Sequence, residues 1–182
     1  MEKMKKLLLF IIVLALAGWA YINFSSQPNP AVKPIANLDP ERYMGTWYSI
    51  LRLPHRFEKD LDNVTAEYRL NEDGTIHVTN KGYNRKKGEW QTATASAEPV
   101  PGMEAGFRVT FFWPFNGGYY IAELGSNYEY AVVVSDSKDY FWLLSRSPRP
   151  SQGLIDEVTT RAYAWGYDIE QFQRVTHGPV ND

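Results

Sequence analysis

Residues 38–53 read LDPERYMGTWYSILRL, and the rest of the chain is organised around this stretch. The Asp-Pro pair can start a helical turn, and the aromatic and branched residues from Trp47 onward favour a strand. Gly45 stands just upstream of this indole, which indicates close backbone packing. A tryptophan at the start of a strand can also plug one end of a closed sheet. An ordinary core tryptophan fits the same residues, so the segments that follow decide between the two interpretations.

The composition is that of one globular domain with a short additional segment. The chain has 182 residues, of which 44% are hydrophobic and 15% aromatic, enough for a single core. A net charge of -2 gives no reason to expect nucleic acid as a partner. The sequence has no cysteine, which excludes disulfides, thiolate metal sites, cysteine nucleophiles and a lipid-modified cysteine.

The N-terminal segment has the features of an export signal. Lysines near the start flank an uninterrupted apolar run over residues 7–17. Small residues after the run suit cleavage by a signal peptidase, whereas extension of the run to Ile22 approaches the lower length of a membrane span, roughly 17 residues. Cleavage and retention both stay open, and either one places the domain outside the cytoplasm. We expect a signal peptide or membrane anchor over 1–22 and a linker over 23–37.

From Trp47 onward the hydrophobic pattern has period two, which is typical of strands. Short turns separate the alternating segments, and no helix intervenes between them. This pattern predicts an all-β fold, an up-and-down antiparallel sheet of eight strands that closes into a barrel. The expected strands are 47–51, 64–70, 76–80, 89–97, 107–111, 119–124, 128–135 and 140–146.

The character of the chain changes after the strands. Ser151 is a suitable N-cap, the apolar residues from Leu154 to Trp165 fall at helical spacing, and Gly166 supplies a stop. We expect one amphipathic helix outside the barrel. A last short strand over 172–175 and a polar tail over 177–182 would follow, so that the barrel domain spans 38–176.

Strand parity predicts which residues meet at the two ends of the barrel. In a meander of eight strands, the start of the first strand and the end of the eighth lie at the same end, so Trp47 and Arg146 should meet there. A guanidinium stacked on an indole is a favourable pair. We therefore expect Gly45, Trp47 and Arg146 to close this end of the barrel.

The loops after strands one, three, five and seven should form the mouth at the other end. Basic residues there could attract a lipid carboxylate or phosphate, or form an ordinary solvated hairpin tip. Apolar residues there could touch a membrane, cover a ligand, join a partner subunit or pack on the barrel top. The candidate mouth residues are Arg85, Lys86, Lys87, Trp113 and Phe115.

One face of the strands should line the barrel interior. A barrel of eight strands either fills with its own side chains or holds one small ligand. The inferred inward set mixes small, large and occasional polar residues, which suits a chain molecule with a polar end. A packed core of the same residues is the alternative. The candidate cavity residues are Val64, Ala66, Tyr68, Ile76, Val78, Asn80, Phe107, Val109 and Phe111.

GTWY at 45–48, the LSRSP segment that carries Arg146, and the eight strands with a following helix resemble the lipocalin family. HRFE at 55–58 and the segments 64–84 and 111–124 are similar to bacterial lipocalins of the apolipoprotein D-like branch. The resemblance implies a barrel that is plugged at the tryptophan end and holds one small hydrophobic ligand. It further implies an envelope lipoprotein that binds fatty acids or lysophospholipids and is associated with membrane upkeep under stress. The chain departs from that pattern because it lacks the cysteine that carries the lipid.

An enzyme is the competing class of protein. His55, His77 and His177 lie far apart in the sequence, and none pairs with a nucleophile or forms a ligand spacing for a metal. The motifs GxSxG and HExxH and a phosphate-binding glycine loop are all absent. We therefore expect a noncatalytic binder of fatty acid or lysophospholipid without a cofactor or metal, in the cell envelope, with a membrane surface as partner and homodimer formation open. The alternatives are a lipocalin-type enzyme with a lipid-like substrate and a structural envelope protein with a filled barrel.

Overall fold

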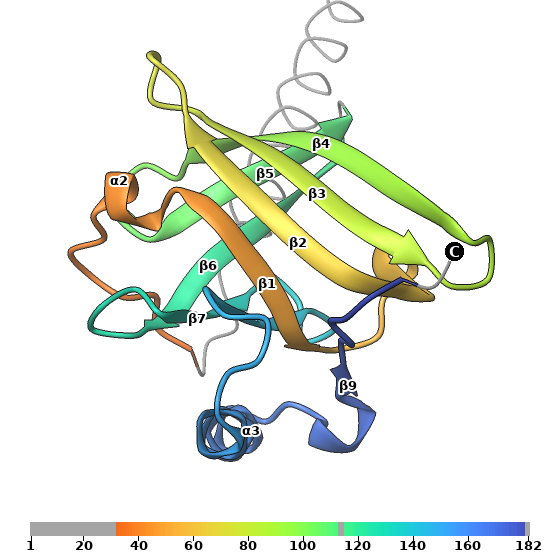
Figure 1. The fold of residues 1–182 in the computed structure, drawn as a ribbon. Coiled ribbons are helices and arrows are strands. Elements are labelled where there is room, and N and C mark those ends of the chain that lie inside the picture. Colours follow the sequence, from red (N-terminus) through yellow and green to blue (C-terminus); the bar gives the residue numbers. More distant parts are fainter. Residues whose placement is uncertain (1–31, 113–114, 181–182) are drawn as a thin grey trace, which may run out of the picture.

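The computed structural model describes residues 32–112 and 115–180, which form a closed antiparallel barrel with one helix outside it (Figure 1). The signal or anchor segment expected over 1–22 and the mouth residue Trp113 lie outside the described residues. The elements in chain order are α2 (Pro40–Tyr43), β1 (Gly45–Arg52), η1 (Arg56–Glu58), β2 (Leu61–Leu70), β3 (Ile76–Asn84), β4 (Glu89–Pro99), β5 (Gly106–Phe112), β6 (Phe115–Leu124), β7 (Tyr130–Val134), β8 (Phe141–Ser145), α3 (Gln152–Ala164), η2 (Ile169–Gln171) and β9 (Gln173–Arg174).

The strands pair with their sequence neighbours from β2 to β8, and β1 then joins β8 to β2. Tyr48 shows this closure directly, since it is opposite Thr65 of β2 and opposite Ser145 of β8. All of these pairings are antiparallel. The structure therefore confirms the predicted up-and-down barrel of eight strands.

Several strand bounds differ from the prediction for local reasons. β2 begins at Leu61 because an extra residue is accommodated next to Asn63, whose φ of 49° marks a bulge. β7 begins only at Tyr130, after a turn that contains Tyr128 with a φ of 60°. Phe115 was expected on a loop and instead begins β6, opposite Phe112. The connection between β5 and β6 is therefore much tighter than the predicted loop.

The seam between β1 and β2 is completed by the C-terminal part of the chain. Pairing of β1 with β2 reaches only Tyr48, and beyond it β9 pairs with Leu51 and Arg52. The first residues of the predicted polar tail are bound at the same seam. His177 Nε2 lies 2.8 Å from the Ser49 carbonyl oxygen, and the Gly178 amide donates to the side chain of Asn63.

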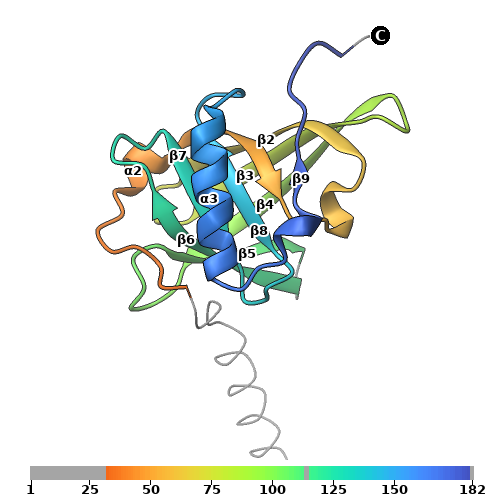
Figure 2. The same ribbon diagram turned by 90° about the horizontal axis from the view of Figure 1, so that it is seen from below.

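Helix α3 lies along the outside of the barrel, as predicted from its periodicity (Figure 2). The hydroxyl of Ser151 accepts the Leu154 amide, which caps the first turn, and Gly166 follows the helix with a φ of 78°. The buried helix residues Ile155, Val158 and Ala162 pack in one cluster with outward side chains of β6 to β8. The members of that cluster from β6 to β8 are Tyr120, Val132, Val134, Phe141 and Leu143.

The end of the expected linker also packs on the barrel. Val32 is 3% exposed and belongs to the cluster beneath α3. The Ile35 amide donates to the carbonyl oxygen of Ile121 at 2.9 Å. Residues 32–37 are thus part of the folded unit, which corrects the expectation of a free linker there. Within the described part of the chain, no helix is long and apolar enough to cross a membrane.

Candidate ligand-binding site

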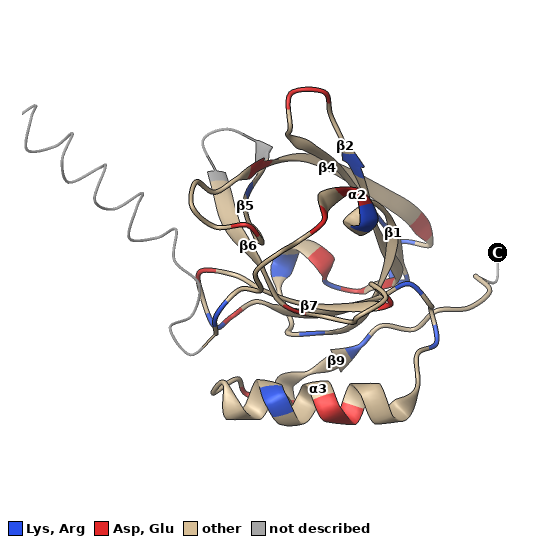
Figure 3. Cartoon of the chain, turned by 90° about the vertical axis from the view of Figure 1, so that its left-hand side faces the viewer, with Lys and Arg blue, Asp and Glu red and all other residues tan. Residues whose placement is uncertain are grey.

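One end of the barrel is closed by Trp47 and Arg146. Trp47 is fully buried, and the guanidinium carbon of Arg146 lies 3.8 Å from the centroid of its ring system. Figure 3 looks along the barrel and shows α2 in front of this end of the ring of strands. The guanidinium donates hydrogen bonds to the carbonyl oxygens of Arg42, Tyr43, Met44 and Thr46 at 2.7 to 3.1 Å. Arg146 therefore joins the α2 segment to the start of β1.

The backbone conformation and the surroundings of position 45 both suit a glycine. Gly45 has a φ of 90°, a conformation that L residues rarely adopt. A Cβ at this position would also lie 3.4 Å from Nη1 of Arg146. The indole N–H of Trp47 donates to the carbonyl oxygen of Tyr43 at 2.8 Å, so α2 is held by the indole and by the guanidinium together.

The residues predicted to face inward separate into two groups. Tyr68, Ile76, Val78 and Phe107 are buried in the cluster that contains Trp47, and Ala66 and Val109 pack against that cluster. Asn80 is partly exposed on the same face of β3 as Ile76 and Val78. Val64 lies in a smaller cluster with Leu61 and Val175. Phe111 belongs to β5, but its side chain lies outside the described part of the structure.

Exposure of the inner face rises from the Trp47 end toward the middle of three strands. On β4, Ala97 is 4% and Ala95 7% exposed, whereas Ala93 on the same face is exposed. On β5 the partly exposed Val109 follows the buried Phe107, and on β3 the partly exposed Asn80 follows Ile76 and Val78, although Asn84 nearer the mouth is buried again. The inner face is therefore buried around Trp47 and partly exposed near the middle of β3, β4 and β5.

Three tyrosine hydroxyls form a chain within the cluster around Trp47. The hydroxyl of Tyr119 lies 2.7 Å from that of Tyr43 and 3.0 Å from that of Tyr68. Burial raises the pKa of Tyr68 to about 12 and raises the pKa values of the other two phenols, so all three stay protonated near neutral pH. Two hydrogen bonds use two of the three hydroxyl hydrogens, which leaves one for an acceptor on a ligand. Of these three tyrosines, only Tyr68 was among the predicted cavity residues. Tyr119 alternates with the inward-facing Ile121 on β6, and this was the signal that its side chain also faces inward.

A polar cluster lies at the opposite end, where η1 folds back on β1. Arg52 is 4% exposed and donates from Nη1 to Oε2 of Glu58 at 2.9 Å. Its Nη2 donates to the carbonyl oxygens of Glu58 and Leu61. The indole N–H of Trp142 donates to Oε1 of Glu58. Burial raises the pKa of Glu58, whereas Arg52 and the Trp142 indole lower it, and the effect of burial is the largest. The Arg52 side chain thus fixes η1 against the barrel.

His55 belongs to the same cluster and has no hydrogen-bond partner among the residues that the structure describes. Its side chain is 6% exposed, and its ring packs near those of Tyr140 and Trp142. Burial, and next the charge of Arg52, lower its pKa to about 4. The ring is therefore neutral near pH 7, so its 3.6 Å contact with Glu58 is not an ion pair there. The sequence suggested only three isolated histidines. The spacing of His55 and Glu58 in HRFE was nevertheless a local signal that these two side chains could meet.

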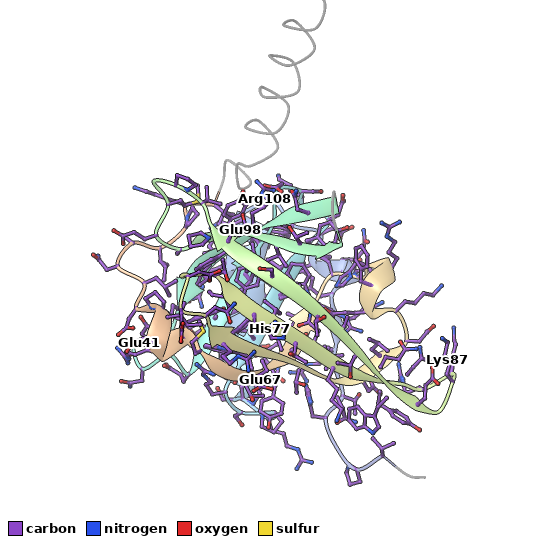
Figure 4. The ribbon with its side chains drawn as sticks, turned by 90° about the horizontal axis from the view of Figure 1, so that it is seen from above. Glu41, Glu67, His77, Lys87, Glu98 and Arg108 are labelled. Atoms are coloured by element: carbon purple, nitrogen blue, oxygen red, sulfur yellow. The ribbon has the colours of Figure 1, made fainter. Side chains whose placement is uncertain are left out.

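The basic residues predicted at the mouth all have acidic neighbours. Arg85 lies 3.1 Å from Asp62, Lys86 3.0 Å from Asp60, and Lys87 3.7 Å from Glu89. Figure 4 shows Lys87 at the tip of the β3–β4 hairpin and Glu41 on α2 at the opposite end of the barrel. The hairpin tip is thereby tied to the segment between η1 and β2. The side chain of Phe115 is outside the description, and among the described residues no group of three or more His, Cys, Asp or Glu could hold a metal.

Comparison with known proteins agrees with this geometry. The family model described as "Lipocalin-like domain" matches the sequence over residues 38–177, which include all eight strands and α3. The chain belongs to the lipocalin family. This lipocalin is 40% identical to the outer membrane lipoprotein Blc of Escherichia coli K12 over 168 residues, which cover 91% of this chain and 94% of that protein. It is 43% identical to Blc of Vibrio cholerae over 78% of this chain and 84% of that protein.

Apolipoprotein D of Macaca fascicularis is 37% identical over 66% of this lipocalin and 67% of that protein. Together with the Blc proteins, it places the chain with the bacterial lipocalins of the apolipoprotein D-like branch. Among solved structures, lobster apocrustacyanin A1 has a TM-score of 0.66 at 15% identity and covers 84% of this chain and 91% of its own. Insecticyanin of the tobacco hornworm has a TM-score of 0.65 at 18% identity, with 84% and 88% covered. These two similarities concern the fold alone.

Proposed function

We propose that this lipocalin is a noncatalytic binder of a small hydrophobic ligand, a fatty acid or a lysophospholipid, in the cell envelope. The observation that supports this most directly is the inner face of the barrel. An apolar surface that is buried around Trp47 and becomes partly exposed along β3, β4 and β5 suits an acyl chain whose end lies against the Trp47 cluster. Storage or transport of such lipids would serve membrane maintenance under stress.

The polar groups at the two ends of the barrel favour an amphiphile over a pure hydrocarbon. The tyrosine chain of Tyr43, Tyr68 and Tyr119 offers one hydroxyl hydrogen near the closed end. Arg52, Glu58 and His55 lie near the mouth. A ligand with an apolar chain and one polar group can satisfy one of these sets and bury its chain against the apolar residues between them.

The envelope location rests on the leader and on the relatives. The apolar run over residues 7–17 has the composition of an export signal. The Blc relatives are described as outer membrane lipoproteins. Since this chain has no cysteine, we infer that its leader acts as a cleaved signal or as an anchor, without lipid attachment at a cysteine.

The ligand can be tested by native mass spectrometry combined with one inward substitution. Purified protein should carry one lipid per chain, and fluorescent fatty-acid probes should bind it. Val109 packs against the inner cluster, so Val109→Trp should occupy ligand space and weaken fatty-acid binding at least about tenfold while the fold survives.

Thr110→Trp is the matched control, because Thr110 is the next residue of β5 and faces the other way. It should leave fatty-acid affinity unchanged. Circular dichroism and thermal unfolding should show a folded barrel in both variants. A protein that carries no lipid and ignores fatty-acid probes would support the structural alternative, and equal binding by both variants would show that the assigned inner face is wrong.

A further inference from the structure

A pocket of about 600 Å³ opens at the mouth end of the barrel. Residues of β1 and the η1 segment line one side of this pocket, and residues of the β3–β4 hairpin and β9 line the other. Two of its lining side chains, Arg52 and His55, are 5% and 6% exposed. Leu61 also lines it and packs with the inner-face residue Val64, so the pocket adjoins the barrel interior.

The charges around this pocket do not cancel. Its two acidic lining residues, Asp60 and Asp62, are paired with Lys86 and Arg85. The buried Arg52 is paired with Glu58. The remaining lining cations are Arg56, Lys59 and Arg174, and within the described ranges none of them makes an ion pair. The pocket therefore presents an excess of positive charge from η1, its flank and β9.

His55 adds an independent indication of a ligand. Within residues 32–112 and 115–180, neither of its ring nitrogens has a hydrogen-bond partner, although both are buried. Buried polar atoms are nearly always paired, so an orphaned imidazole on a pocket wall indicates a group that binds there. A neutral imidazole can donate one N–H to that group.

We propose that this pocket binds a phosphate group, as a monoester or a diester. A phosphate presents several strong acceptor oxygens and one to two negative charges, which suit three cations without ion pairs, two from the η1 segment and one from β9, and one imidazole N–H. A carboxylate offers only two oxygens and one negative charge to the same donors. The phosphate belongs either to a lipid headgroup, whose acyl chain then lies in the barrel, or to a small soluble phosphate ester; only the first source rests on the proposed function.

Isothermal titration calorimetry with three probes tests the proposal. The probes are glycerol 3-phosphate, a lysophosphatidic acid and the free fatty acid with the same acyl chain. We expect lysophosphatidic acid to bind about tenfold more tightly than the fatty acid, because only the former carries the phosphate. That difference should disappear in the double variant Lys59→Gln/Arg174→Gln. It should persist in Lys138→Gln, which removes an exposed lysine from the loop after β7, outside the pocket.

His55→Phe provides a second variant, since a phenyl ring keeps the contacts with Tyr140 and Trp142 and removes both nitrogens. It should lower the affinity for lysophosphatidic acid by a larger factor than the affinity for the fatty acid. In the wild type, addition of the phosphate probe should shift the imidazole ¹⁵N signals of His55 in NMR spectra.

The outcomes separate this site from the proposed function. Tight binding of glycerol 3-phosphate that does not compete with lipid supports the site with a soluble phosphate ester as its ligand. If fatty acid and lysophosphatidic acid bind equally and no variant alters their ratio, the phosphate site is overturned while the lipid carrier stands. If neither lipid binds and glycerol 3-phosphate still does, the carrier function is wrong and the site is supported.

Discussion

At the scale of single residues, the closed end of the barrel depends on a small set of contacts around one guanidinium. Arg146 stacks on Trp47 and donates to four backbone carbonyls, two of which belong to residues of α2. Gly45 allows this arrangement because its φ of 90° is a conformation that L residues rarely adopt. The three residues therefore act as one unit.

Substitution of Gly45 by alanine tests that unit. Gly45→Ala should lower the free energy of unfolding by about 2 kcal/mol, because an alanine is strained at this φ and its Cβ would touch Nη1 of Arg146. Gly74→Ala is the control, since Gly74 has a similar φ of 82° with no atom within 4 Å of an added Cβ. It should cost only about 1 kcal/mol. Urea unfolding measures both, and equal losses would mean that the contact with Arg146 contributes nothing.

The residues of the candidate site were predicted unevenly. Parity and the GTWY stretch led directly to Trp47 and Arg146, because strand direction alternates regularly along a meander. The same reasoning missed Tyr119 of β6, whose hydroxyl meets that of Tyr68, and Tyr43, whose hydroxyl meets Tyr119 only once α2 folds back over the barrel end. It also missed the role of His55, because the rings of Tyr140 and Trp142 that bury this histidine are far away in the sequence.

At the scale of elements, α3 contributes stability from outside the barrel. Val158 is fully buried between the helix and the outward side chains of the strands. Val158→Ala should lower the free energy of unfolding by about 2 kcal/mol through lost burial and a small cavity. Fatty-acid affinity should not change, because the helix packs on the face that is turned away from the barrel interior.

Thr160→Ala, at an exposed position of the same helix, should change stability by less than about 0.5 kcal/mol. Chemical denaturation and probe titration of both variants check this, and a loss of affinity in Val158→Ala would contradict the separation of helix and site.

Elements with a strong side-chain period were predicted well, and those held by backbone groups were not. The period of α3 and its Ser151 cap identified the helix, and alternation located all eight strands. The first part of β6 was predicted as a loop because Asn116, Gly117 and Gly118 are typical turn residues. In the structure these residues pair with β5 as strand, and the Gly118 amide also donates to a carboxylate oxygen of Asp136. That carboxylate comes from a distant loop, which local reasoning cannot anticipate.

At the scale of the whole molecule, His55 makes stability depend on pH. Its pKa is about 4 in the folded protein and 6.5 ordinarily, so between these values the unfolded chain binds a proton that the folded chain does not. Stability should therefore fall as the pH drops from 6.5 toward 4. Between pH 7 and 4, the wild type should lose on the order of 2 kcal/mol more than His55→Phe.

Glu58 acts in the opposite direction, since burial raises its pKa and its contribution falls as the pH rises through that raised value. The carboxyl is present in both proteins, so the comparison with His55→Phe isolates the imidazole. Urea unfolding at several pH values provides the curves. Parallel curves would show that the histidine does not titrate differently in the folded state.

The closed shape of the molecule followed from the pattern of period two, but its seam did not. β9 and the residues that follow it join β1 largely through backbone amides and carbonyls, which leave no trace in the order of side chains. Residues 177–178 were predicted as a free polar tail for the same reason.

The seam also determines when the molecule can fold during its synthesis. β1 is the first strand to leave the ribosome, yet one of its edges pairs only with β8, and the last part of its other edge pairs with β9. Until those late strands emerge, both edges stay at least partly open and able to pair with other chains. The barrel therefore closes only after β8 and β9 have been synthesised.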